Sequence, residues 1–87
     1  KSIAEFLKIK NFNNRQAEII KWFYEEPGSM LTVREVQTRL AVSEQSARND
    51  LAGLLTMGFL SPVSLNKKST AYTRSPEFDE LLKEKLT

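Results

Sequence analysis

The stretch LTVREVQTRLAVSEQSARNDLAGLL, residues 31–55, contains two short amphipathic segments separated by a turn of about three residues. Thr32 followed by Glu35 fits a capping box at the start of the first segment, and apolar residues recur at helical spacing as far as Leu40. Ser43 is a good N-cap for the second segment. Two helices joined by so tight a turn are typical of a helix-turn-helix, and we expect this pair to be the centre of the fold.

The second of these helices is expected to end at Gly58, because glycine suits the left-handed position that follows a helix. Its apolar side consists of Ala47, Leu51, Leu54 and Leu55, and its far side of Gln45, Asn49, Ala52, Gly53 and Thr56. Glycine inside a helix costs about 1 kcal/mol relative to alanine. We therefore expect Ala52 and Gly53 to let the far side of this helix approach another surface closely.

The segment before this pair predicts one further core helix over residues 14–26. Asn13 is placed to cap it, with Gln16 three residues on to complete a capping box. A short amphipathic helix is also expected over residues 2–8. Trp22 lies at the edge of the apolar face, where we expect it to cover that short helix; the alternative is contact with a partner.

The apolar period changes from helical to two in the second half of the chain. Residues 59–65 and 70–74 have the pattern of two strands, joined by the polar NKKS of residues 66–69, and so predict a β-hairpin. Pro62 favours an edge position for the first strand, because proline cannot donate a backbone hydrogen bond to a neighbour. Residues 29–31 are expected to form a short extended piece.

The chain is expected to close with a helix over residues 76–86, with Ser75 as its N-cap followed by proline. Three helices, a hairpin and a closing helix predict a mainly α protein with a small β-hairpin wing, which is the winged helix-turn-helix fold. We expect a single domain over residues 1–87, with its core at about residues 12–75. Because the chain begins at Lys1 without a methionine, it is expected to be a fragment of a longer protein.

Composition excludes several classes of function. The 87 residues, 40% of them hydrophobic, fit one small domain with no room for a deep substrate cleft. Cysteine is absent, which excludes disulfides and thiolate metal sites and makes a reducing compartment, the cytoplasm, the expected location. Histidine is also absent, so we expect neither an enzyme nor a bound metal or cofactor. No apolar run approaches the roughly 20 residues of a membrane-spanning helix.

The whole chain has a net charge of +2, and its middle is the most basic part: residues 29–75 carry six basic and three acidic side chains, a local charge of +3. In a DNA major groove, the second helix of the pair would direct Gln45, Ser46 and Asn49 toward base edges, and Arg48 toward a base or a phosphate. The hairpin tip would add two lysines for phosphates. The residues expected to bind double-stranded DNA are Ser43, Gln45, Ser46, Arg48, Asn49, Lys67, Lys68 and Arg74.

The same segment also fits a module that does not contact DNA. Glu44 lies in the first turn of the helix, where it favours the helix dipole but would repel a phosphate. Asp50 is expected to offset the charge of Arg48. The polar side chains of the helix would then be solvated, and the domain would bind another protein or act as a spacer. The residues alone leave both interpretations open.

Two resemblances to known families add to this pattern. VSEQSARNDLAGLLTMGFL, residues 42–60, resembles the recognition helix and first wing strand of DeoR-type repressors. A more specific match is the ordered set FNNRQAEIIKWF, LTVREVQTRLAVSEQSARNDLAGLL, NKKSTAY and SPEFDELL. This set covers roughly residues 12–82 and is similar to the C-terminal winged helix of Fic (filamentation induced by cAMP) family proteins.

The resemblance to Fic proteins implies a preceding domain that transfers AMP from ATP to hydroxyl side chains through a His-Pro-Phe motif. Because this chain has no histidine, it would be a non-catalytic appendage. The winged-helix placement of the family carries over to Ser43, Arg48, Asn49, Asp50 and Leu51. Where the DeoR pattern often has a second arginine, Asn49 lowers the expected affinity for phosphate.

The leading hypothesis is therefore a DNA-binding regulatory domain appended to a Fic-type AMP-transferring protein. The alternative is a protein-interaction or dimerisation module that regulates the Fic domain of the same chain, or joins a second copy, without DNA contact. A third interpretation, a fragment of a stand-alone DeoR-type repressor, requires a sugar-phosphate-sensing domain downstream.

Overall fold

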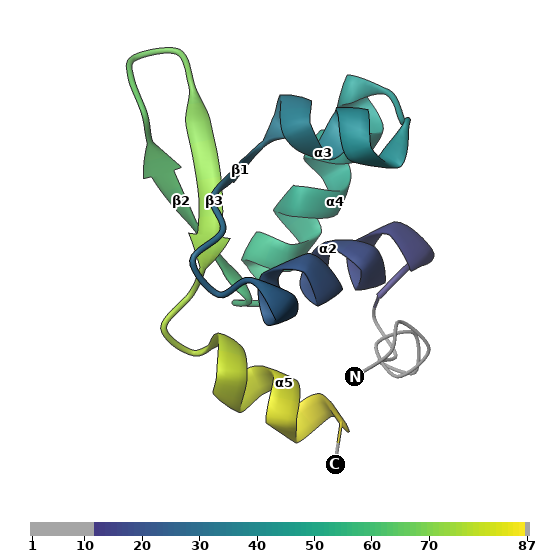
Figure 1. The fold of residues 1–87 in the computed structure, drawn as a ribbon, viewed down its shortest axis with the longest axis vertical. Helices are drawn as coiled ribbons and strands as arrows, with labels where there is room; N and C mark the ends of the chain where they lie inside the picture. Colours follow the sequence, from purple (N-terminus) through teal and green to yellow (C-terminus); the bar gives the residue numbers. More distant parts are fainter. Residues whose placement is uncertain (1–11, 87) are drawn as a thin grey trace.

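The computed structural model describes residues 12–86, which form four helices and three short strands (Figure 1). In chain order the elements are α2 (Asn14–Glu25), β1 (Leu31–Thr32), α3 (Val33–Leu40), α4 (Glu44–Thr56), β2 (Leu60–Ser64), β3 (Thr70–Arg74) and α5 (Phe78–Leu86). The helices α3 and α4 form the helix-turn-helix, and the β2–β3 hairpin is the wing. The expected winged helix-turn-helix fold is confirmed. The helix expected over residues 2–8 lies outside the described residues.

The wing belongs to a three-stranded antiparallel sheet in the order β1-β3-β2. The strands β2 and β3 form the expected hairpin, with Ser64 opposite Thr70 beside its turn. Pro62 lies in β2, which is an edge strand, as the sequence predicted. The other edge is β1, where Leu31 pairs with Tyr72. Because α3 begins directly after β1, this pairing holds the start of α3 against the wing.

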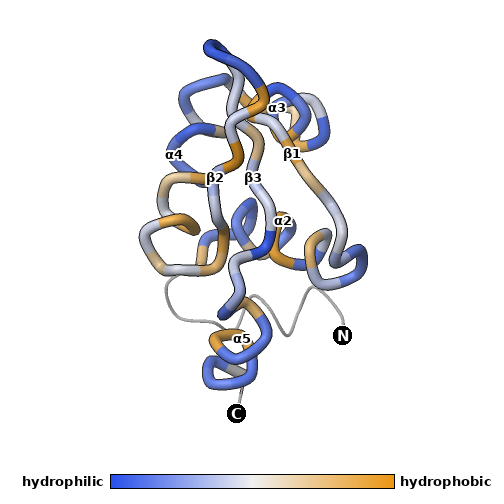
Figure 2. The backbone as a smooth tube through the Cα atoms, turned by 90° about the vertical axis from the view of Figure 1, so that its left-hand side faces the viewer, coloured by the Kyte–Doolittle hydropathy of each residue, from blue (hydrophilic) through white to orange (hydrophobic). Residues whose placement is uncertain are grey.

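The core lies between the helices and the inner end of the wing. Its largest fully buried side chains are Phe23, Phe59, Phe78, Ile19, Ile20, Leu51, Leu54 and Val36. The Phe59 ring contacts Phe12 and Phe78 edge to face, with ring centroids 5.3 and 5.9 Å apart. Each such side chain contributes roughly 1.5–3 kcal/mol by leaving water. The tip of the wing and the turns around α3 are mostly hydrophilic, which Figure 2 shows in blue.

The expected N-terminal caps of the three core helices are confirmed. Asn13 and Gln16 form the capping box of α2, and Thr32 and Glu35 form that of α3. Ser43 caps α4. Each cap satisfies backbone N–H groups that have no partner within the helix, so each helix begins where its cap stands.

Both helices of the helix-turn-helix end in a Schellman motif. After α3, Ala41 adopts the left-handed conformation with a φ of 54°, and the next N–H donates to the Gln37 carbonyl. After α4, Gly58 has a φ of 89°, and the following N–H donates to the Leu54 carbonyl. The same reversal of direction thus ends both helices, once with alanine and once with glycine.

The last helix starts later than expected. The sequence predicts a helix over residues 76–86 capped by Ser75, but α5 begins at Phe78. The Ser75 hydroxyl donates instead to the Gly58 carbonyl at 2.5 Å, and the side chain is buried. It satisfies a carbonyl at the C-terminal end of α4, so its role is to join the end of β3 to the end of α4.

Trp22 is half-buried and packs against the core from α2. The guanidinium carbon of Arg39, in α3, lies 5.1 Å from the centroid of its ring, which is a cation–π distance. Trp22 thus joins α2 to α3; its expected contact with residues 2–8 lies outside the described residues. Over residues 12–86, the helices are too short or too polar to span a bilayer.

Candidate nucleic-acid interface

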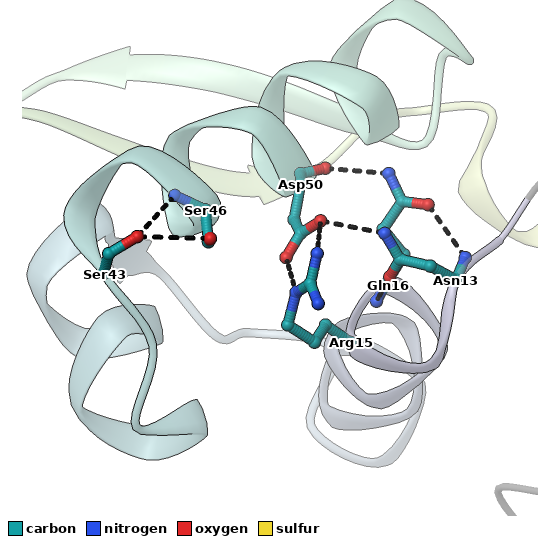
Figure 3. Close-up of polar contacts among 6 residues, drawn as sticks. All are labelled: Asn13, Arg15, Gln16, Ser43, Ser46 and Asp50. Atoms are coloured by element: carbon teal, nitrogen blue, oxygen red, sulfur yellow. Dashed lines mark hydrogen bonds and ion pairs between the residues drawn. The ribbon is translucent and has the colours of Figure 1, made fainter.

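Ser43 and Ser46 form the first turn of α4 together. The Ser43 hydroxyl oxygen accepts a hydrogen bond from the Ser46 N–H at 3.2 Å, and its O–H donates to the Ser46 hydroxyl at 3.1 Å (Figure 3). Both serines belong to the set that the sequence predicts to bind DNA. In the structure they are hydrogen-bonded to each other, and Ser43 caps the helix.

Asp50 holds α4 to α2. Its side chain is 3% exposed and accepts hydrogen bonds from Arg15 Nε at 2.6 Å and from Asn13 Nδ2 at 2.9 Å (Figure 3). The expectation that Asp50 offsets Arg48 is wrong, because the carboxylate points into the contact between the two helices and is matched by Arg15. Arg48 pairs instead with Glu44, one turn back along α4, at 3.3 Å.

Arg15 and Gln16 complete this contact from the side of α2. The hydrogen bond with Asp50, and then the charge of that carboxylate, raise the pKa of the Arg15 guanidinium above its usual value, so Arg15 stays charged at every working pH. Gln16 donates from Nε2 to the Asp50 carbonyl at 3.2 Å. Within the described part of the chain, every buried side-chain nitrogen and oxygen has a hydrogen-bond partner. The orientation of α4 is therefore held by a satisfied polar network.

Gly53 faces α2 and not the far side of α4. A Cβ atom at this position would lie 2.5 Å from Gln16 Nε2, which is closer than side chains pack. The expectation that Gly53 opens the outer surface of the helix is therefore wrong. The absence of a side chain at Gly53 leaves room for the Gln16 amide. Ala52 is exposed, as expected.

The outer face of α4 carries two joined amides. Gln45 and Asn49 are exposed and lie one turn apart, and Gln45 Nε2 donates to Asn49 Oδ1 at 2.9 Å. Ala52 and Thr56 continue the same face and are also exposed. Since these four side chains take no part in the core, the whole strip is open to a ligand.

A groove of about 1000 Å³ lies between α3, the first turns of α4 and the wing. Its lining includes three basic side chains, from Arg34, Arg48 and Lys68, and one acidic side chain, from Glu44. Hydroxyl groups also line the groove and add hydrogen-bond donors; they belong to Thr32, Thr38, Ser69, Thr70 and Tyr72. Positive charge beside hydrogen-bond donors is the chemistry that binds a phosphate group.

Arg34 is the basic residue of the groove that the sequence did not predict as a binding residue. It is exposed in the first turn of α3. In the sequence, Arg34 contributes only to the positive charge of residues 29–75. Its place in the groove depends on the pairing of Thr32 with Ala71, which brings the start of α3 beside the wing. A two-residue strand has no sequence pattern of its own, so the sequence does not indicate that Arg34 lies beside the wing.

The tip of the wing is ordered by Asn66. Its side-chain oxygen accepts hydrogen bonds from the N–H groups of Lys68 and Ser69, each at 2.9 Å. Lys67 and Lys68 are both exposed, as expected, and Lys68 lines the groove. The hairpin thus presents two ammonium groups on a turn of defined shape.

Arg74 lies apart from the other expected residues. It is at the end of β3 away from the tip, opposite Leu60. Its guanidinium pairs with Asp79 and lies over the Phe78 ring, 4.3 Å from the centroid, and the side chain is 15% exposed. The structure uses this arginine to attach α5 to the wing.

Comparison of the chain with solved structures supports the architecture. No protein-family model matches the chain, and no curated protein matches its sequence. Solved structures do match. The heme sensor protein PefR from Streptococcus agalactiae has a TM-score of 0.74 at 15% identity, over 94% of this chain and 57% of that one. The shared feature is the winged helix-turn-helix.

Two further solved structures show the same likeness. The transcriptional regulator BldR from Sulfolobus solfataricus has a TM-score of 0.69 at 19% identity, covering 94% of this chain and 61% of that one. MepR from S. aureus in complex with DNA has a TM-score of 0.72 at 14% identity, covering 93% and 60%. The chain spans about three-fifths of the length of these three proteins. At these identities the likeness establishes the fold.

Proposed function

We propose that this chain is a DNA-binding regulatory domain that places α4 in the major groove and the wing on the phosphate backbone. The observation that carries the proposal is the groove, to which α3, α4 and the wing contribute one basic side chain each, Arg34, Arg48 and Lys68. The polar outer face of α4 adjoins it. DNA recognition needs base-edge and phosphate contacts on one surface, and this surface offers both.

The solved structures and the charge distribution support the proposal. BldR is described as a transcriptional regulator, and MepR has been solved with DNA. Asp50 does not oppose a phosphate, because it is buried and paired with Arg15. Glu44 remains beside Arg48, but an exposed ion pair of this kind opens at little cost, so Arg48 can exchange that carboxylate for a phosphate.

The proposal gives each candidate residue a separate task. The phosphate contacts come from Arg34, Arg48, Lys67 and Lys68. Gln45 and Asn49 face the bases, while Ser43 and Ser46 position the helix that carries them. Arg74 is not part of the proposed interface, because its charge is engaged at the base of the wing.

Salt dependence tests this arrangement. Four phosphate contacts predict a log–log slope of affinity against salt of about −3 to −4, measured by fluorescence anisotropy with a labelled pool of random duplexes. Arg34→Ala and Lys68→Ala should each make the slope shallower by about 1, because each removes one contact. Lys85→Ala removes the same charge from an exposed position in α5 and should leave the slope unchanged. No binding at low salt, or an equal effect of Lys85→Ala, would contradict the proposal.

We further propose that the domain acts within a longer Fic-type AMP-transferring protein, in the cytoplasm, and has no catalytic role itself. The support is the ordered set of four sequence segments over residues 12–82. The coding sequence upstream of Lys1 tests it, since a His-Pro-Phe motif is expected there. An upstream sequence without that motif refutes the parentage and leaves the proposed DNA binding untouched.

A further inference from the structure

The exposed surface of α4 divides into two faces with different chemistry. Glu44 and Arg48 line the groove beside the wing, whereas Gln45 and Asn49 are absent from its lining. Gln45 and Asn49 lie instead on the side of the helix opposite the fully buried Leu54, as their helical spacing requires. The Arg48 guanidinium thus faces the groove between α3, α4 and the wing, and the two amides are exposed on the side of α4 that faces away from the core.

The two amides are joined in a way that leaves a defined set of hydrogen-bonding groups. The bond from Gln45 Nε2 to Asn49 Oδ1 occupies one of the two lone pairs of that oxygen. Both N–H groups of Asn49 Nδ2 remain available, as do the Gln45 Oε1 acceptor and its second N–H. Within residues 12–86, neither side chain makes another hydrogen bond. The pair therefore presents donors and an acceptor side by side.

These groups match one base better than the others. In the major groove adenine presents the N7 acceptor beside the N6 amino donor, and asparagine or glutamine pairs with both. Guanine presents two acceptors, which are best matched by arginine or lysine. The described residues of α4 include one basic residue, Arg48, and it faces the groove of the protein between α3, α4 and the wing. The outer face therefore lacks the side chains that suit guanine.

We propose that the Gln45–Asn49 pair reads an adenine, so that the domain recognises an A·T base pair in the major groove. Ala52 is exposed on the same face, one turn beyond, and its methyl group can contact the methyl group of thymine. The proposal rests on the proposed DNA binding and adds the base class that α4 selects. It makes Gln45 and Asn49 the specificity-determining residues, and Arg34, Arg48 and Lys68 sequence-independent contacts.

The test begins with selection of sites from a pool of randomised duplexes by the full chain. We expect the selected sites to share at least one A·T pair. Each adenine of a selected site is then replaced by 7-deazaadenine, and each guanine by 7-deazaguanine. At one adenine the loss of N7 should weaken binding roughly 3- to 10-fold, because one of two hydrogen bonds is lost, while the guanine replacements should have little effect.

Substitutions of Gln45 and Asn49 test whether the amide pair is responsible for the base preference. Asn49→Ala and Gln45→Ala should reduce the preference for A·T over G·C at that position by roughly 5- to 150-fold, with an unchanged salt slope. Arg34→Ala is the matched comparison: it should weaken all sites alike, flatten the slope and keep the preference. Circular dichroism confirms that each variant is folded.

The outcomes separate this inference from the function on which it rests. Three results would overturn the inference alone, provided that salt-dependent binding is seen. They are the absence of an A·T preference, a preference that persists in Asn49→Ala, and a loss of affinity at 7-deazaguanine. Absence of binding to any duplex at low salt overturns the proposed function and the inference with it.

Discussion

Asp50 and Gly53 of α4 face the same neighbour, the first turn of α2. Asp50 accepts from Arg15, which is 35 residues away in the sequence, and Gly53 leaves space for Gln16. The sequence predicts that Asp50 offsets Arg48 because the two residues lie only two positions apart in the chain. Helical spacing indicates instead that Asp50 lies on the same side as the buried Ala47 and Leu54, and a buried carboxylate requires a partner.

A double-mutant cycle tests the role of Gly53. Gly53→Ala gains about 1 kcal/mol of helix propensity, but its Cβ displaces Gln16 from the Asp50 carbonyl. We expect a net loss of unfolding free energy in the parent chain, and a gain of about 1 kcal/mol when Gln16 is already alanine. Urea denaturation measures both.

Ala52 supplies the control for this cycle. It is exposed on the outer face of α4, away from Gln16, so Ala52→Gly should cost about 1 kcal/mol in either background. Equal effects of Gly53→Ala in the two backgrounds would show that contact with Gln16 is not the reason why position 53 requires glycine.

At the scale of elements, local signals were sufficient wherever a cap or a period defines the element. The capping residues Asn13, Thr32 and Ser43 predict where α2, α3 and α4 begin, and the period of two predicts the wing. Two features depended on contacts between distant segments and were not predictable. They are the pairing of β1 with β3, and the commitment of Ser75 to Gly58 in place of a helix cap.

The two Schellman motifs predict opposite effects of exchanging alanine and glycine. Ala41 has a left-handed conformation, which costs a residue with a Cβ about 1–2 kcal/mol. Ala41→Gly removes this strain, but glycine also has more conformational freedom in the unfolded chain. The net result should be a rise in the unfolding free energy of up to about 1 kcal/mol. Gly58→Ala should lower it by about 1–2 kcal/mol or more, because the new Cβ would also lie 3.3 Å from Leu81 Cδ1.

Thermal unfolding followed by circular dichroism measures both changes, and a shift of 1 kcal/mol corresponds to roughly 4–8 °C in Tm for a domain of this size. Changes of the same sign at the two positions would mean that backbone strain does not govern the ends of these helices.

At the scale of the whole molecule, the topology separates charge between two ends. The pairing of β1 with β3 gathers the basic groove at the wing end, while the last helix lies at the other end (Figure 1). Residues 76–86 carry four acidic and two basic side chains. The molecule is 39 Å long, several times the screening length of about 8–10 Å at physiological salt, so the two ends act nearly independently on a DNA backbone.

Moving charge between the ends, without changing its total, tests whether binding follows the groove or the net charge. Lys68→Glu with Glu80→Lys keeps the net charge of +2 but transfers positive charge from the groove to α5. We expect this variant to lose affinity for random duplexes and to show a salt slope shallower by about 1–2, because a phosphate contact is replaced by repulsion. Lys85→Glu with Glu80→Lys moves the same charges within α5 and should bind as the parent does. If both variants bind equally, attraction by net charge, and not the groove between α3, α4 and the wing, governs the encounter with DNA.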